Sequence, residues 1–238
     1  MNVNDAAILV GALLASYAIG SLPWAYLIVR FVTGEDITAH GTGNVGAMNV
    51  RRSTGSWSWF VVAMVMDASK GILPAFVAKW LVGGGNLSPL RPWGTVLVSM
   101  SSIWWHQPLL FMPMIAVAGA VLGHNYSAWM ALAKRGFHRT GKGLATGGGA
   151  LIAYDWRYFV AAVAVGLAVI AITRFMMAGQ VAAAITLPLA ALALRSPDWP
   201  FALLMGGLVY AAHHKRFIGL LKGNEPMFYI DDRMGPRG

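Results

Sequence analysis

The stretch WSWFVVAMVMDASKGILPAFVAKWLV, residues 57–82, is apolar over most of its length. A helix needs about 20 residues to cross a bilayer core of about 30 Å, so this stretch predicts a membrane span despite Asp67, Lys70 and Pro74 inside it. Asp67 and Lys70 share one helix face and can pair, which reduces the cost of two charges in the membrane. Ionisable residues within a membrane are usually functional. Two interpretations stay open, a structural brace for the loops and a substrate contact.

The composition of the whole chain is that of a membrane protein. Of its 238 residues, 57% are hydrophobic and 11% are charged, whereas soluble domains carry about 25% charged residues. The chain has no cysteine, which excludes disulfides, thiolate metal sites and a cysteine nucleophile. The net charge of +9 would suit a nucleic acid, but in a membrane chain an unequal distribution of bases among the loops explains it better. We expect no nucleic-acid partner.

The remaining apolar stretches predict an all-α, polytopic integral membrane protein with about seven transmembrane helices. No internal repeat and no second domain are visible, so residues 1–238 are expected to form a single membrane-embedded domain. Residues 93–105 are interpreted as an interfacial or partial helix. The seven predicted spans are residues 6–32, 57–82, 109–133, 143–154, 158–173, 175–194 and 199–212.

Three short segments rich in glycine and basic residues interrupt the apolar chain. They follow the first, third and seventh predicted spans, which places all three on one side of the membrane. That side holds most of the lysines and arginines, so the positive-inside rule makes it the cytoplasm and puts the N-terminus outside. We expect a multi-pass protein of the inner (plasma) membrane with its chemistry facing the cytoplasm. The segments are residues 41–52 (GTGNVGAMNVRR), 139–146 (RTGKGLAT) and 213–225 (HHKRFIGLLKGNE).

Each of these segments suits an anion such as phosphate. Glycines let backbone N–H groups approach an anion closely, and a neighbouring lysine or arginine supplies the countercharge. The competing interpretation is that the basic residues only set the topology. Arg52 and Lys142, which lie among glycines, favour the phosphate interpretation.

Taken in order, the polar segments resemble the motifs of one known family. GTGNVGAMNVRR resembles the G-S-G-N-x-G-A-T-N-V-x-R loop of the bacterial acyl-phosphate-dependent glycerol-3-phosphate acyltransferases, the PlsY family. The run from Asp67 to Gly71 is similar to its D-x-x-K-G element, and Thr173-Arg174 to a T-R pair. Gly123-His124 with residues 140–146 resembles G-H…G-G-K-G-V-A-T, and residues 213–225 resemble H-x-x-N-I-x-R-L-x-x-G-x-E. The chain is identified as a divergent member of this family.

The resemblance implies transfer of a fatty acyl group from acyl phosphate to the 1-hydroxyl of glycerol 3-phosphate. The products are lysophosphatidic acid, a precursor in phospholipid biosynthesis, and phosphate; no cofactor and no metal are expected. An acyl phosphate is an activated mixed anhydride, so the enzyme supplies a positioned hydroxyl and stabilises the oxyanion and the departing phosphate. Lys142 suits that phosphate, and His213 is a candidate base. The catalytic candidates are Thr42, Lys142 and His213, and the substrate-binding candidates are Gly41, Gly43, Asn44, Asn49, Arg52, Gly141, Gly143, Arg216 and Glu225.

The chain also departs from the family pattern. Ser127 replaces the proline that follows G-H-x-x, and Thr140 replaces the first glycine of G-G-K-G. Met48 replaces the threonine of A-T-N, while Arg216 falls on the family asparagine and Gly219 on the family arginine. Either a phosphate-binding charge has moved by one helical turn, or the acceptor is a different phosphorylated alcohol.

The alternative from another class is a transporter or channel for a small anion, for which broken helices and a basic vestibule would serve. That class leads us to expect polar residues through the membrane and repeat symmetry. The polar residues of this chain crowd one side instead, which favours an enzyme.

Overall fold

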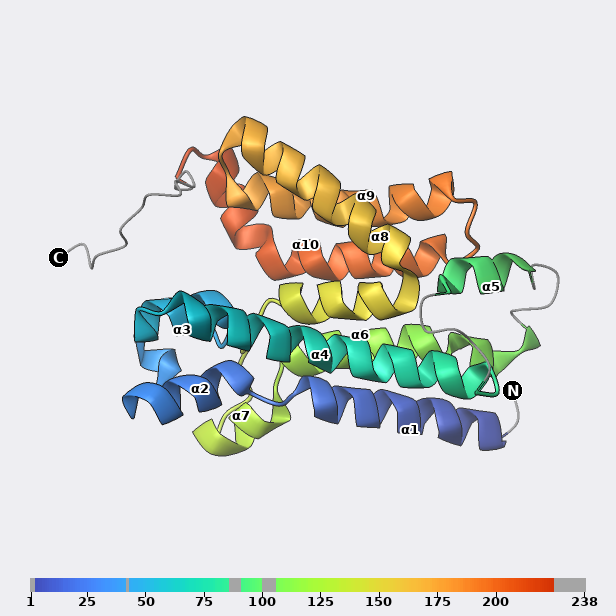
Figure 1. The fold of residues 1–238 in the computed structure, drawn as a ribbon, viewed down its shortest axis with the longest axis horizontal. Coiled ribbons are helices and arrows are strands. Elements are labelled where there is room, and N and C mark those ends of the chain that lie inside the picture. The colour runs from blue at the N-terminus through green and yellow to red at the C-terminus, as the bar shows by residue number, and fades with distance from the viewer. Residues whose placement is uncertain (1–2, 42, 86–90, 100–105, 225–238) are drawn as a thin grey trace. The chain divides into compact units, whose positions relative to one another are not determined.

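The computed structural model describes residues 3–41, 43–85, 91–99 and 106–224, and over these ranges the regular structure is entirely helical (Figure 1). The chain divides into two compact units, Met1–Trp156 and Arg157–Gly238. The first unit begins with α1 (Val3–Gly20), α2 (Trp24–Thr33), η1 (Ile37–Ala39), α3 (Ala47–Thr54) and α4 (Trp57–Val82). It continues with α5 (Trp93–Ser99), η3 (Pro108–Phe111), α6 (Met112–Asn125), α7 (Ala128–Lys134) and the first part of α8 (Leu144–Thr173).

Small residues let the long helices of the first unit pack closely. Figure 1 shows α1, α4 and α6 side by side. A Cβ added at Gly123 of α6 would collide with the backbone of α1 at Tyr17, and one added at Gly71 of α4 would collide with the Thr146 carbonyl of α8. Close backbone approach at small residues is the usual way in which helices associate within a membrane.

Within the part of the chain that the structure describes, five helical stretches are long and apolar enough to cross a membrane. Their outward side chains include large apolar residues such as Leu14, Val65 and Leu167, which are 61%, 59% and 61% exposed. Exposed apolar surface on this scale is unfavourable in water but suits lipid. The stretches are Val3–Thr33, Trp57–Val82, Pro108–Lys134, Leu144–Thr173 and Met176–Ala193.

Two of the expected spans are interrupted. The span expected over residues 6–32 matches the stretch Val3–Thr33, but it contains a break, because α1 ends at Gly20 and α2 starts at Trp24. Pro23 lies between them with φ −90° and ψ 64°, and proline has no N–H to continue a helix. The span expected over residues 109–133 matches the stretch Pro108–Lys134, which is likewise divided, into η3, α6 and α7.

Two further predictions concern the break near residue 155 and the partial helix over residues 93–105. The break expected near residue 155 is confirmed, because Asp155 has φ −153° and ψ 98° inside α8. The partial helix expected over residues 93–105 matches α5 as far as Ser99, and residues 100–105 lie outside the described residues.

The second unit consists of the later part of α8 together with α9 (Met176–Ala193) and α10 (Trp199–Leu221). α10 extends well beyond the expected end at residue 212. Gly206 of α10 lies against the Ala184 carbonyl of α9, and a Cβ there would be 2.5 Å from that oxygen. The Tyr158 hydroxyl donates to Asp198 Oδ1 at 2.6 Å, and both residues are buried.

A buried lysine caps the break in α8. Lys79, near the end of α4, is 2% exposed. Its Nζ donates to the carbonyls of Ala153 at 2.5 Å, Tyr154 at 3.3 Å and Arg91 at 2.8 Å. Asp155 itself accepts from the Gly94 N–H at 3.2 Å. The last carbonyls of a helix lack partners within the helix, so the Lys79 ammonium stabilises the helix end that the break creates.

We therefore expect Lys79→Met to lower the free energy of unfolding. The variant keeps an apolar stem but leaves buried carbonyls without their donor, a loss of about 1–3 kcal/mol. Lys222→Met is the matched control, because Lys222 is exposed. Thermal unfolding in detergent measures both variants, and a Lys79→Met protein as stable as the control would contradict the capping role.

Candidate functional site

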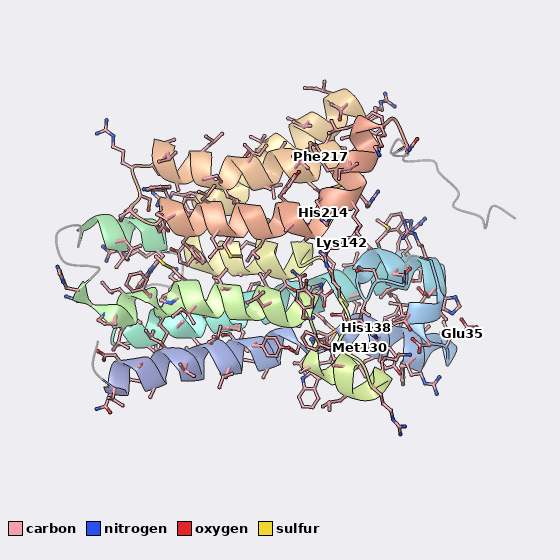
Figure 2. All side chains as sticks on the ribbon, turned by 180° about the vertical axis from the view of Figure 1, so that it is seen from behind. Glu35, Met130, His138, Lys142, His214 and Phe217 are labelled. Atoms are coloured by element: carbon pink, nitrogen blue, oxygen red, sulfur yellow. The ribbon has the colours of Figure 1, made fainter. Side chains whose placement is uncertain are left out.

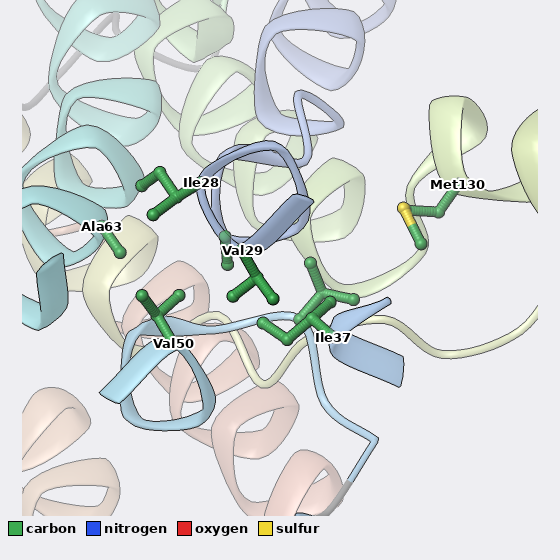
Figure 3. Close-up of a cluster of buried hydrophobic side chains, with 8 residues drawn as sticks. Ile28, Val29, Ile37, Val50, Ala63 and Met130 are labelled. Carbon is green, nitrogen blue, oxygen red and sulfur yellow. The ribbon is translucent and has the colours of Figure 1, made fainter. Parts of the chain in front are cut away.

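A small apolar core holds the first glycine-rich segment in place. Ile28 and Val29 of α2, Ile37 of η1 and Val50 of α3 are all buried and pack together (Figure 3). The cluster joins the elements on both sides of residues 41–46. The other buried members are Ala25, Val45, Ala63 and Met130.

The Asn49 side chain stabilises the backbone around the first segment. Its Nδ2 donates to the carbonyls of Ile37 and His40, both at 3.0 Å. Gly41 has φ +54°, and a Cβ added there would collide with Asn49 Oδ1 and lie 3.1 Å from Arg52 Cδ. The structure therefore brings the candidates Gly41, Asn49 and Arg52 together, and Asn49 shapes the loop through its amide.

The rest of the first segment forms a tight turn. Gly43 has φ +67°, a conformation that favours glycine, and its N–H donates to the His40 carbonyl at 2.9 Å. Asn44 is half-buried beside Gly46. The candidate Thr42 lies outside the described residues.

The second segment is hydrogen-bonded to the first. The Val45 N–H donates to the Thr140 carbonyl at 2.7 Å, and the Thr140 N–H donates to the Asn125 carbonyl at 2.8 Å. Residues 41–52 and 139–146, expected to act together, do lie side by side. This contact is the firmest geometric support for a shared site.

Lys142 lies between two constrained glycines, immediately before α8. Gly141 packs against the ring of His124, where an added Cβ would collide. Gly143 has φ +72° and directly precedes the first residue of α8. Lys142 is half-buried, and Figure 2 shows it toward the end of the first unit at which α1 ends. A helix N-terminus with a lysine beside it attracts an anion.

The ion pair foreseen within α4 is present and buried. Lys70 Nζ lies 2.7 Å from Asp67 Oδ1, and each side chain is 3% exposed. Lys70 also donates to the Leu22 carbonyl at 2.8 Å, in the break between α1 and α2, and lies 3.2 Å from His124 Nδ1. The Thr146 hydroxyl donates to the Asp67 carbonyl at 2.9 Å. The pair thus ties α4 to α6, to α8 and to the first break.

A small cavity adjoins this cluster and the second segment. It is lined among others by Lys70, His124 and Thr140, and by Ser21 and Leu22 from the break after α1. Asn49 Oδ1 in the first segment and Asn125 Oδ1 at the end of α6 are buried, and neither has a hydrogen-bond partner among the residues that the structure describes. A Cβ at Gly143 would lie 3.0 Å from Asn125 Oδ1. These oxygens are suited to accept a hydrogen bond from a ligand hydroxyl.

The third segment belongs to the second unit, and most of it is helical. His213 is 3% exposed, and its Nδ1 lies 2.8 Å from the Val209 carbonyl one turn earlier in α10. Arg216 and Gly219 are also within α10, and Arg216 is exposed. Glu225 lies outside the described residues. A meeting of this segment with the other two stays a prediction.

Two polar residues at this site, Thr140 and Asn125, are absent from the sequence-based candidates. Thr140 does carry a signal, because a hydroxyl replaces a glycine within the resembled motif. Asn125 falls on a variable position of that motif, so its sequence context gives no comparable sign.

Comparison with known proteins identifies close similarity over nearly the whole chain. A family model described as glycerol-3-phosphate acyltransferase matches residues 10–223. The glycerol-3-phosphate acyltransferase of Thermosynechococcus vestitus is 33% identical over 224 residues, which cover 92% of this chain and 95% of the relative. That of Gluconobacter oxydans is 30% identical over 223 residues, covering 92% of each chain.

Solved structures show the same fold. Crystal structures of PlsY, an integral membrane glycerol 3-phosphate acyltransferase, superpose in a glycerol 3-phosphate form with a TM-score of 0.71 and in a lysophosphatidic acid form with a TM-score of 0.70. The first is 24% identical and the alignment covers 93% of this chain and 96% of that chain. The second is 23% identical and covers 93% of this chain and 95% of that one.

Proposed function

The chain belongs to the glycerol-3-phosphate acyltransferase family, and from this premise we propose that it transfers a fatty acyl group from acyl phosphate to the 1-hydroxyl of glycerol 3-phosphate. It is an integral membrane acyltransferase of phospholipid synthesis. The products are lysophosphatidic acid and inorganic phosphate. The observation that carries the proposal is the hydrogen bond from Val45 N–H to the Thr140 carbonyl, because it joins the two glycine-rich segments.

We assign the donor's phosphate to the second segment. Lys142 supplies the countercharge, and the N–H groups of Gly141 and Gly143 at the start of α8 donate to the phosphate oxygens. The attacking hydroxyl forms a bond to the acyl carbon, and the bond between that carbon and the phosphate oxygen breaks. Negative charge grows on the departing phosphate during this step, so Lys142 stabilises the transition state more than the bound donor.

We assign the acceptor's phosphate to the first segment. Arg52 beside Gly41 can bind a phosphate with two parallel hydrogen bonds, and the proposed roles of Thr42, Gly43 and Asn44 are neutral hydrogen bonds. The buried side-chain oxygens of Asn49 and Asn125, which have no partner among the described residues, suit the hydroxyls of a small alcohol.

The third segment completes the proposed site. His213 takes the proton of the attacking hydroxyl or orients the acceptor, and Arg216 and Glu225 contribute to acceptor binding. The acceptor's own phosphate is the alternative base. Two arrangements of the charge at Arg216 and Gly219 stay open, a relocated phosphate contact and a pocket for another phosphorylated alcohol.

We interpret Asp67 and Lys70 as the structural brace of this site. Both side chains are 3% exposed, and their partners Leu22, His124 and Thr146 are protein groups. Through these contacts the pair supports the break after α1 and the first turn of α8. A substrate contact would require opening this buried arrangement.

The proposed topology retains about seven membrane crossings within a single membrane-embedded domain. The N-terminus lies outside, and the three basic segments face the cytoplasm from the inner (plasma) membrane. Support comes from the distribution of basic residues and from the first unit, where the ends of α1 and α6 meet: the Tyr17 hydroxyl donates to the Tyr126 carbonyl at 2.6 Å.

Replacing Arg52 by lysine is expected to raise the KM for glycerol 3-phosphate about tenfold. The charge stays, but a compact ammonium cannot form the paired hydrogen bonds of a guanidinium. The KM for acyl phosphate should change by less than about twofold, because the donor's phosphate is assigned to Lys142. Initial rates with each substrate varied in turn measure both constants, and equal effects on the two would contradict the assignment.

A panel of substrates tests the proposed function. Purified protein is incubated with acyl phosphate and a set of phosphorylated alcohols, with acyl-CoA as the control donor. We expect the highest turnover with glycerol 3-phosphate and none with acyl-CoA. Absence of transfer from either donor to any acceptor would favour the anion transporter instead.

A further inference from the structure

Thr140 connects three parts of the first unit. Its hydroxyl donates to the His124 carbonyl at 2.8 Å and accepts from the Ser127 N–H at 3.2 Å. Its own N–H donates to the Asn125 carbonyl at 2.8 Å, and its carbonyl accepts from Val45 at 2.7 Å. The residue is 8% exposed. All of its polar groups are therefore paired with the end of α6, the start of α7 or the first glycine-rich segment.

Among these hydrogen bonds, those of the Thr140 hydroxyl depend on the side chain, whereas the others are made by the backbone. Because Gly141 packs against the ring of His124, the bond from Thr140 to the carbonyl of the same histidine fixes the backbone that enters Lys142. We propose that Thr140 is a positioning residue, whose hydroxyl holds the Lys142 segment in register with the end of α6 and, through Val45, with the first segment.

Ser127 is the hydrogen-bond partner of the Thr140 hydroxyl. Its φ of −69° is the value that a proline ring imposes, and the resembled motif has proline at this place. Proline offers no N–H, and the glycine that the motif has at position 140 offers no hydroxyl. In this chain serine supplies the donor and Thr140 the acceptor. The N–H gained at Ser127 is thus paired by the hydroxyl gained at Thr140, and we treat the two departures from the motif as one coupled substitution.

The effect of Thr140 on turnover rests on the proposed function. Thr140→Val keeps the shape and removes the hydroxyl, leaving the Ser127 N–H and the His124 carbonyl without it. Displacement of a catalytic group lowers the reaction rate by about 10- to 100-fold, so we expect kcat of the Thr140→Val variant to fall by that factor. The KM for the donor should change by less than about threefold, because Lys142 keeps its charge. Thr140→Ser retains the hydroxyl and should recover most of kcat.

The coupling is tested by thermal unfolding in detergent, which is independent of any substrate. Ser127→Pro removes the N–H together with the hydroxyl, whereas Ser127→Ala keeps the N–H and removes only the hydroxyl, which accepts from the Met130 N–H at 3.2 Å and donates to the Ser21 carbonyl. Thr140→Val should lower Tm by about 2–4 °C in the parent and in the Ser127→Ala background. In the Ser127→Pro background the loss should be clearly smaller, because no buried N–H is left unpaired. Equal losses in the proline and alanine backgrounds would overturn the coupling.

Thr186→Val is the matched control, because the Thr186 hydroxyl donates within its own helix, to the Ala182 carbonyl at 2.8 Å. It should leave kcat and Tm near those of the parent. An active parent whose Thr140→Val variant turns over at the parental rate would overturn the positioning role. A parent without acyl transfer would overturn the proposed function alone, and the unfolding comparison would still decide the coupling.

Discussion

Lys142→Ala is expected to lower kcat/KM for acyl phosphate by about 10³-fold. Loss of one fixed donor at a developing negative charge reduces kcat by about 10²–10³-fold, and Lys142 contributes a full charge as well. The lysine lies between Gly141, packed on His124, and Gly143, with φ +72°. This geometry holds it at the start of α8, where the departing phosphate is assigned.

The control is Lys222→Ala, which removes one positive charge from an exposed position. Both variants should insert into the membrane and unfold like the parent, because Lys142 is half-buried and Lys222 is exposed. Initial rates with saturating glycerol 3-phosphate give kcat/KM for the donor. A Lys142→Ala enzyme within about threefold of the parent retains its transition-state binding to within 1 kcal/mol and would remove Lys142 from the mechanism.

Lys70→Met is expected to lower the free energy of unfolding by about 3–5 kcal/mol. Removing one member of a buried ion pair leaves the other as an uncompensated charge, here Asp67 at 3% exposure. The double variant Asp67→Leu/Lys70→Met leaves no charge behind, so it should be more stable than the single variant. Thermal unfolding in detergent measures this order.

The same variants separate a brace from a substrate contact. A brace predicts that the double variant, where it folds, keeps the parental KM for both substrates. If instead Lys70→Met unfolds like the parent and raises the KM of one substrate, the pair contacts that substrate and the structural interpretation is wrong.

The sequence predicted the helices that depend on local pattern. Residues 57–82 form α4, and the break at Asp155 falls between the spans predicted over residues 143–154 and 158–173. The break at Pro23 was missed because the apolar character continues across it, so hydropathy gives no sign of the interruption. Its stabilisation by Lys70 comes from a side chain far along the chain.

The site was also only partly predictable, because contacts between residues far apart in the sequence shape it. The segments around Arg52 and Lys142 were recognisable from glycine and charge, and the bond from Val45 to Thr140 joins them. Lys79 is 2% exposed and caps the break in α8, a role that no motif in the sequence indicates. Long-range pairing decides such roles, and a single sequence does not encode which carbonyl a lysine meets.

The most direct test measures lysophosphatidic acid and inorganic phosphate in the same reaction. Purified protein in detergent receives acyl phosphate and glycerol 3-phosphate, and Lys142→Ala serves as the blank. We predict one 1-acyl lysophosphatidic acid for each phosphate released above the blank. Phosphate release without lysophosphatidic acid, or acyl transfer that proceeds only from acyl-CoA, would contradict acyl-phosphate-dependent transfer to glycerol 3-phosphate.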